Sequence, residues 1–181
     1  MTGVEAIAEL FAGPGAQDYL GEAVTIGEHM RQAGALAEAA GAAAPLVAAA
    51  LLHDVGHLRS ETDAGHGTGG ARWLSRWFGE AVTEPVRLHV AAKRYLCAVD
   101  PGYARLLSPA SVYTLGVQGG PMRGAELAAF AASPYAQTAC RLRRWHDAAK
   151  EPGVTAPPFE HFKSLLSGLL RTPASGTSGP S

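Results

Sequence analysis

The sequence is poor in cysteine and in the residues that favour β-sheets. Only Cys97 and Cys140 occur among its 181 residues. Two cysteines provide no disulfide framework, which is typical of a protein in a reducing cytoplasm. β-branched residues are sparse, and no tight turn is flanked by alternating apolar segments, so a hairpin-based fold is disfavoured. Alanine, leucine and glutamate dominate instead, and this composition predicts an all-α protein.

Net charge and long apolar runs are also lacking. The formal net charge is -1, which gives no reason to expect a nucleic-acid or membrane partner. The longest apolar run, residues 42–52, is interrupted by Pro45 and is too short to span a bilayer. No cationic segment followed by an apolar stretch opens the chain. We therefore expect a cytoplasmic protein.

The length suits one domain with a real core and is too short for two. We expect this domain over residues 1–171 and a disordered tail over 172–181, which offers no large apolar side chain to bury. Thr25 with Glu28 resembles a capping box, Gly41 stands where a helix can end, and Pro85 and Pro101 suit first turns. Apolar periodicity predicts helices over residues 4–11, 25–40, 45–53, 70–78, 84–95, 108–115, 123–132, 135–150 and 159–170.

Histidines and aspartates form one ordered series along the chain. Imidazole and carboxylate groups are the donors that iron, manganese and zinc prefer. A buried charge is costly unless it is paired or bound to metal, and one adjacent pair ends the most apolar predicted helix. Six donors suffice for two metal ions, with one carboxylate able to bridge them. The series consists of His29, His53, Asp54, His66, His89 and Asp147.

Three further side chains, His57, Lys93 and Arg144, each lie one helical turn from one of these donors and could bind an anion, and hydroxyl side chains could add neutral donors. Lys93 follows His89 by four residues, and Glu22 offers a carboxylate for an ammonium group at the other end of a small ligand. Purely structural roles are also possible for these residues. Lys93 could be a solvated helix residue, and Arg144 could form a structural salt bridge. The hydroxyls of Ser111 and Thr114 could cap the chain, and Tyr19 could be a packing aromatic. The anion-binding candidates are His57, Lys93, Ser111, Thr114 and Arg144.

The order of the donors resembles the HD-domain superfamily, whose members are mostly metal-dependent phosphohydrolases. His66 and His89 add a second metal site, which narrows the resemblance to the branch that uses two irons and O₂. Tyr19 and Glu22 in YLGEAVT, His57 at the end of HDVGH, residues 108–122 and the run LRRWHDAAK are similar to the phosphonate-degrading HD-domain oxygenases. The similarity extends from Tyr19 to about Lys150.

This resemblance implies an HD-domain helical bundle with an Fe(II)/Fe(III) pair. One iron would be held by His29, His53, Asp54 and Asp147, and the other by His66, His89 and the shared Asp54. Tyr19 would bind the second iron in the absence of substrate and would leave it when substrate binds. Glu22 would meet the substrate's amino group, and His57 and Lys93 would also act in catalysis. The implied reaction converts 2-amino-1-hydroxyethylphosphonate and O₂ into glycine and phosphate, with both electron pairs drawn from the substrate.

One position departs from that family. Its members usually carry an acidic residue before the last aspartate, and here the residue is His146. A shifted register would make His146 the ligand, but Arg144 and Asp147 keep their helical offset, so we assign Asp147. We expect His146 and His161 to lie at the surface or behind the ligands.

Three other functions are consistent with the sequence. The first is an HD-type phosphohydrolase acting on a nucleotide or a related ester. The second is a sister oxygenase for a trimethylammonium or hydroxymethyl analogue; a polyol substrate is disfavoured by the short chain. The third is a catalytically silent metal-binding domain. The sequence does not identify the exact hydroxyphosphonate. It also does not distinguish iron from manganese or give the oligomeric state.

Overall fold

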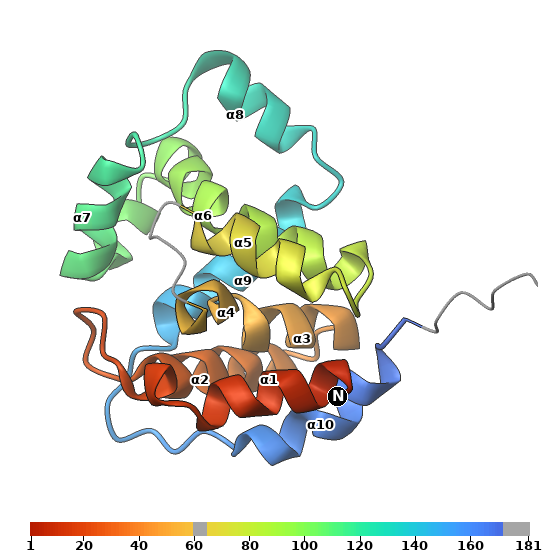
Figure 1. Ribbon diagram of the computed structural model, residues 1–181. Coiled ribbons are helices and arrows are strands. Elements are labelled where there is room, and N and C mark those ends of the chain that lie inside the picture. The colour runs from red at the N-terminus through yellow and green to blue at the C-terminus, as the bar shows by residue number, and fades with distance from the viewer. Residues whose placement is uncertain (60–64, 172–181) are drawn as a thin grey trace, which may run out of the picture.

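The computed structural model describes residues 1–59 and 65–171 (Figure 1), and within these ranges it contains helices and no strand. This confirms the all-α prediction, while the proposed tail over 172–181 lies outside the described residues. No helix in the described ranges is long and apolar enough to cross a membrane. The helices are α1 (Gly3–Ala12), α2 (Ile26–Ala39), α3 (Ala44–Leu52), α4 (Val55–Leu58), α5 (His66–Leu74), α6 (Glu80–Val99), α7 (Pro109–Val117), α8 (Gly124–Ala131), α9 (Ala136–Ala148) and α10 (Phe159–Gly168), with 3₁₀ turns at Pro14–Gln17 and Tyr103–Leu106.

Helix α3 forms the centre of the core. All its residues from Leu46 to Leu52 are buried, as expected for a helix that is apolar on every side. Helices α2, α6 and α9 pack around it. In Figure 1, α1 and α10 lie together at one end of the molecule, and α7 and α8 lie toward the other. The polar residues that follow α3 are therefore delivered into the interior of the bundle.

Several local predictions are confirmed. Thr25 and Glu28 form a reciprocal capping box at the start of α2: the Glu28 amide donates to Thr25 Oγ1 at 3.2 Å, and the Thr25 amide donates to Glu28 Oε2 at 2.9 Å. Gly41 follows α2 with a φ of +64°, a backbone conformation that glycine adopts without a side-chain clash.

Other boundaries differ from the predicted ones. After α3 the chain forms a further short helix, α4, which is absent from the predicted set, and α5 begins at His66 rather than at residue 70. Helix α6 begins at Glu80, so Pro85 lies inside it, where it costs one backbone hydrogen bond. Pro101 lies in a turn before the 3₁₀ segment rather than in a helix. For α5 and α6, tertiary packing extends the helix beyond its local signals.

Candidate metal centre and binding cavity

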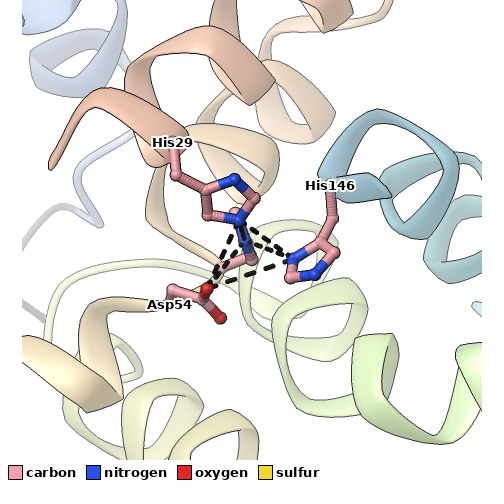
Figure 2. A group of neighbouring side chains, drawn as sticks. His29, Asp54 and His146 are labelled. Atoms are coloured by element: carbon pink, nitrogen blue, oxygen red, sulfur yellow. Dashed lines mark hydrogen bonds and ion pairs between the residues drawn. The ribbon is translucent and has the colours of Figure 1, made fainter. Parts of the chain in front are cut away.

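Two groups of metal-donor side chains meet at the carboxyl end of α3. The first contains His29, His53, Asp54 and His146, and the second contains Asp54, His66 and His89; all six residues are buried. Figure 2 shows His29 from α2, Asp54 from the α3–α4 junction and His146 from α9 directed toward one another. Asp54 belongs to both groups, so its carboxylate lies where a bridging ligand would be needed.

The distances within the first group are short. His53 Nε2 lies 3.0 Å from His29 Nε2 and 2.9 Å from His146 Nδ1, and the last two atoms are 3.1 Å apart. Asp54 Oδ2 faces this group at 3.2 Å from His53 Nε2 and 3.5 Å from His29 Nε2. Four donor atoms from three separate segments thus point at one small volume.

The second group faces the other carboxylate oxygen. Asp54 Oδ1 lies 3.4 Å from His66 Nε2 and 3.3 Å from His89 Nε2, and the two imidazole nitrogens are 3.0 Å apart. Because each oxygen of Asp54 faces a different pair or trio of imidazoles, the carboxylate can bridge two ions. This arrangement matches the sharing of Asp54 that the resemblance implies.

Backbone carbonyls fix the orientation of three of the imidazoles. His29 Nδ1 lies 2.8 Å from the Ala149 oxygen, and His53 Nδ1 lies 2.7 Å from the Ala50 oxygen. His89 Nδ1 makes the same contact with the carbonyl of residue 86 at 2.7 Å. A carbonyl oxygen only accepts, so each Nδ1 carries the proton and each Nε2 presents a lone pair to the group.

The protonation states suit a cation at this place. Burial lowers the pKa of His29, and it lowers the pKa of His89 to about 3. Burial and the positive charge of Arg143 hold the pKa of His146 well below its ordinary value. Burial alone would raise the pKa of Asp54, but the neighbouring histidines hold it well below its usual range. Neutral imidazoles around an ionised carboxylate are the donor set of a transition metal.

An unsatisfied atom supports the same fit. Asp54 Oδ1 is buried and, among the residues that the structure describes, receives no hydrogen bond. A buried carboxylate oxygen without a partner is costly, and the Nε2 lone pairs of His29 and His53, which face one another at 3.0 Å, repel unless a cation lies between them. The donor groups therefore fit metal ions.

Helix α9 places different residues at the site from those the sequence analysis selected. Asp147, expected as the fourth ligand of the first metal, binds Arg143, with Oδ1 2.6 Å from Nη2, and accepts a short hydrogen bond from the Tyr103 hydroxyl. His146, expected behind the ligands or at the surface, takes the inward position. Successive helical residues point about 100° apart, so only one of these neighbours can face His29.

The same rotation corrects the expected role of Arg144. Its side chain is about half exposed and pairs with Asp100 at 2.8 Å, away from the cavity. Arg143 faces inward instead. The missed signal is the spacing of Ala136, Ala139, Arg143 and His146, which marks one buried face of α9.

A cavity of about 350 Å³ opens beside the metal donors. Its lining includes three cationic side chains, and the acidic residues among its described lining are Glu22 and Asp54. Of these cations Lys93 was predicted from the sequence, and Arg143 and Lys150 were not. Besides four members of the donor groups, His29, Asp54, His66 and His146, the cavity walls carry Lys93, Ser111, Thr114, Arg143 and Lys150.

The three cations converge on Ser111. Arg143 Nη2 donates to Ser111 Oγ at 3.3 Å, and Lys150 Nζ donates to the same oxygen at 3.0 Å. Lys93 Nζ donates to Thr114 Oγ1 at 2.7 Å and to the Ser111 carbonyl at 3.4 Å. Burial and the charge of Arg143 lower the pKa of Lys93 to about 7. Cations held this close favour an anion between them.

The remaining predicted residues also line this cavity. Glu22 Oε1 accepts from Lys150 Nζ at 2.6 Å and from Ser108 Oγ at 2.8 Å, so the carboxylate is already engaged by a lysine that sequence reasoning missed. Tyr19 lines the cavity but is 57% exposed, which places it on the solvent side. The His57 ring stacks on His66, with centroids 4.0 Å apart.

The sequence is similar to known proteins over most of its length. The HD domain family matches residues 26–108. The chain is 39% identical over 176 residues to the 1-hydroxy-2-(trimethylamino)ethylphosphonate dioxygenase (glycine-betaine-forming) of Leisingera caerulea, covering 92% of this chain and 90% of that protein. It is 42% identical over 164 residues to the hydroxymethylphosphonate dioxygenase of Gimesia maris, covering 85% and 82%. An uncharacterised protein of Acanthamoeba polyphaga mimivirus is 32% identical over 174 residues, covering 90% and 80%. The chain therefore belongs to the HD-domain family of phosphonate oxygenases.

Proposed function

We propose that this protein is a dioxygenase that cleaves the carbon–phosphorus bond of a small 1-hydroxyphosphonate. The observation that carries the proposal is a cavity lined on one side by members of both donor groups and on another by three cations around Ser111. The identity to two curated hydroxyphosphonate dioxygenases over most of the chain supports the same reaction class.

The metal ions in this proposal are two irons, in the Fe(II)/Fe(III) state that the family resemblance implies. Asp54 would be shared between them, His66 and His89 would hold the second, and His29, His53 and His146 would hold the first. Bound iron supplies electron transfer to O₂ and the positive charge that acidifies the substrate's hydroxyl. The protein supplies the binding, the orientation and the electrostatic environment.

The cationic wall binds the phosphonate in this account. Lys93, Arg143 and Lys150 offer charged donors, and the hydroxyls of Ser111 and Thr114 add neutral ones. A dianion here replaces repulsion among the three cations with attraction, and it raises the fraction of Lys93 that is protonated. Holding the phosphonate on this wall directs the neighbouring C–OH toward the metal donors, which is the positioning that cleavage requires.

The far end of the substrate is recognised near Glu22. For 2-amino-1-hydroxyethylphosphonate, the Glu22 carboxylate is the group that binds the substrate's ammonium. The ammonium and Lys150 would then share that carboxylate. The curated relatives are named for a trimethylamino and a hydroxymethyl substrate. All three compounds carry the same hydroxyphosphonate head and differ only at this end.

The reaction balances without an external reductant. One molecule of 2-amino-1-hydroxyethylphosphonate and one of O₂ give one glycine and one phosphate: the carbon–phosphorus bond breaks, the carbinol carbon is oxidised to a carboxylate, and O₂ is fully reduced. For the other two substrates the same balance gives glycine betaine or formate beside phosphate.

The test is phosphate release by iron-loaded protein, measured together with O₂ consumption, for the three hydroxyphosphonates and a panel of nucleotides. The proposal predicts one phosphate per O₂ from at least one hydroxyphosphonate and no release without O₂. Phosphate release from a nucleotide under anaerobic conditions would instead show a phosphohydrolase. Tight metal binding without any turnover would show a silent metal-binding domain.

A further inference from the structure

The side chain that α9 presents to the first donor group is a neutral imidazole. His146 Nδ1 lies 2.9 Å from His53 Nε2 and 3.1 Å from His29 Nε2, and 4.0 Å from Asp54 Oδ2. The other ring nitrogen, Nε2, faces the Asp147 carboxylate at 3.8 Å. His146 therefore meets the group through Nδ1, whereas His29 and His53 meet it through Nε2.

The use of Nδ1 has a geometric consequence. In histidine Nδ1 is bonded to Cγ, and in aspartate each carboxylate oxygen is also bonded to Cγ. Either residue at position 146 would place its donor atom at nearly the same distance from the helix axis. A histidine at position 146 therefore gives the first metal site a neutral ligand in place of an anionic one, with the donor atom at nearly the same distance from the helix.

No other carboxylate in the described residues makes up for that charge. Asp147 is bound to Arg143 and Tyr103. Glu22 is bound to Lys150 and Ser108. Asp54 is consequently the one carboxylate in the two donor groups, and it is shared between them.

Neutral ligands favour the reduced state of a metal ion. Where two imidazoles replace two thiolates on one iron of an iron–sulfur cluster, the reduction potential rises. Protonated Lys93 on the adjoining wall acts in the same direction, because it disfavours an additional positive charge on the metal, whereas the charges of Arg143 and Lys150 are offset by Asp147 and Glu22.

We propose that His146 is the fourth protein ligand of the first metal ion and that this neutral ligand raises the reduction potential of the iron pair. The proposal rests on the iron pair of the proposed function but not on any substrate. It assigns to His146 the control of iron valence, and to Asp147 only the support of Arg143 and Tyr103.

The experiment compares full-length wild type with His146→Asp, His146→Asn and His146→Ala, each loaded anaerobically with iron and free of substrate. Asparagine and aspartate place an oxygen at the same reach and differ in charge, so this pair separates coordination from charge. His161→Asn is the matched control, because His161 is an exposed histidine paired with Glu38. Iron per chain and affinity are measured by titration, and the ferric fraction at fixed potentials by Mössbauer spectroscopy.

The proposal predicts at least tenfold weaker binding of one iron in His146→Ala and unchanged binding in His161→Asn. It predicts at least a tenfold higher ferric-to-ferrous ratio in His146→Asp than in wild type or His146→Asn, which corresponds to about 59 mV for a one-electron couple. Unchanged binding of two irons in His146→Ala would overturn the ligand assignment. Equal ferric fractions in His146→Asp and His146→Asn would overturn the role of charge. Because no substrate is present, failure of the oxygenase proposal would leave these results unaffected and would appear only in the turnover assay.

Discussion

The backbone of His66 occupies the space in which a side chain at Gly56 would begin. A Cβ built on Gly56 would lie 2.2 Å from the His66 carbonyl oxygen, far inside any contact that real atoms make. A Cβ built on Gly70, one turn further along α5, would also lie close to the Gly56 backbone, at 3.1 Å from its amide nitrogen. This contact between α4 and α5 brings His66 to Asp54 and thereby completes the second donor group.

Substitution of Gly56 by alanine is expected to displace His66. The added methyl must push α5 away, which we expect to cost about 1–3 kcal/mol or more of unfolding free energy and to remove the second metal before the first. Metal titration and thermal unfolding measure the two effects. Gly168→Ala is the control, since nothing lies within 4 Å of a Cβ there. A Gly56→Ala protein that binds both metals with wild-type affinity would refute the structural role.

Asp54→Asn is expected to remove both metals. The amide keeps the size of the carboxylate but loses the charge that each donor group shares, so neither set of imidazoles retains an anionic ligand. Metal analysis after gel filtration should show less than about a tenth of the wild-type content, since losing even a hydrogen-bonding partner of a ligand costs about 10–100-fold in metal affinity. Asp100→Asn, at the exposed pair with Arg144, should retain full content. Loss of only one metal would contradict the bridging assignment.

Activity is expected to fall on the alkaline side as Lys93 loses its proton. Burial and the charge of Arg143 lower the pKa of Lys93 to about 7, so the free enzyme carries the protonated form below that pH and the neutral form above it. The phosphonate dianion binds the protonated form, and kcat/KM reports the free enzyme. We therefore expect kcat/KM to decline as the pH rises through about 7.

Arginine stays protonated throughout this range, so Lys93→Arg should flatten that decline even where its overall activity is lower. A pH profile of the two proteins between pH 6 and 9 provides the comparison. The same alkaline decline in both would show that another group is responsible.

The Glu22 carboxylate is expected to discriminate among substrate ends. Glu22→Gln should lower kcat/KM for 2-amino-1-hydroxyethylphosphonate by at least about tenfold, which corresponds to about 1.4 kcal/mol, because the ammonium loses its charged partner. Hydroxymethylphosphonate carries no such group and should lose about threefold or less, well under 1 kcal/mol. Iron content should not change, because Glu22 belongs to neither donor group. Equal losses for both substrates would refute recognition of an amino group at this position.

Much of the site was predictable because it depends on residue type and order. The HD pair follows a helix with no polar face, so His53 and Asp54 had to emerge inside the core, and the capping box at Thr25 defined the start of the helix that carries His29. Five of the predicted ligands, His29, His53, Asp54, His66 and His89, lie in the two donor groups. Lys93, Ser111 and Thr114, chosen as anion donors, contact one another.

The errors in the predicted site residues come from the rotation of one helix, α9, and from contacts between residues that are distant in sequence. On α9, Arg144 and Asp147 share a face three residues apart, and so do Arg143 and His146; only packing against α2 and α6 decides which pair points inward. The Lys150–Glu22 ion pair joins residues 128 positions apart. No local pattern encodes such a contact, because it depends on the path of the chain after α9.

The measurement that tests the account most directly is anomalous diffraction at the iron absorption edge from crystals of the iron-loaded protein. The account predicts two iron peaks, one beside each carboxylate oxygen of Asp54, the first also contacted by His29, His53 and His146 and the second by His66 and His89. A single peak, with His66 and His89 turned away from it, would contradict the shared-carboxylate centre on which the proposed oxygenase depends.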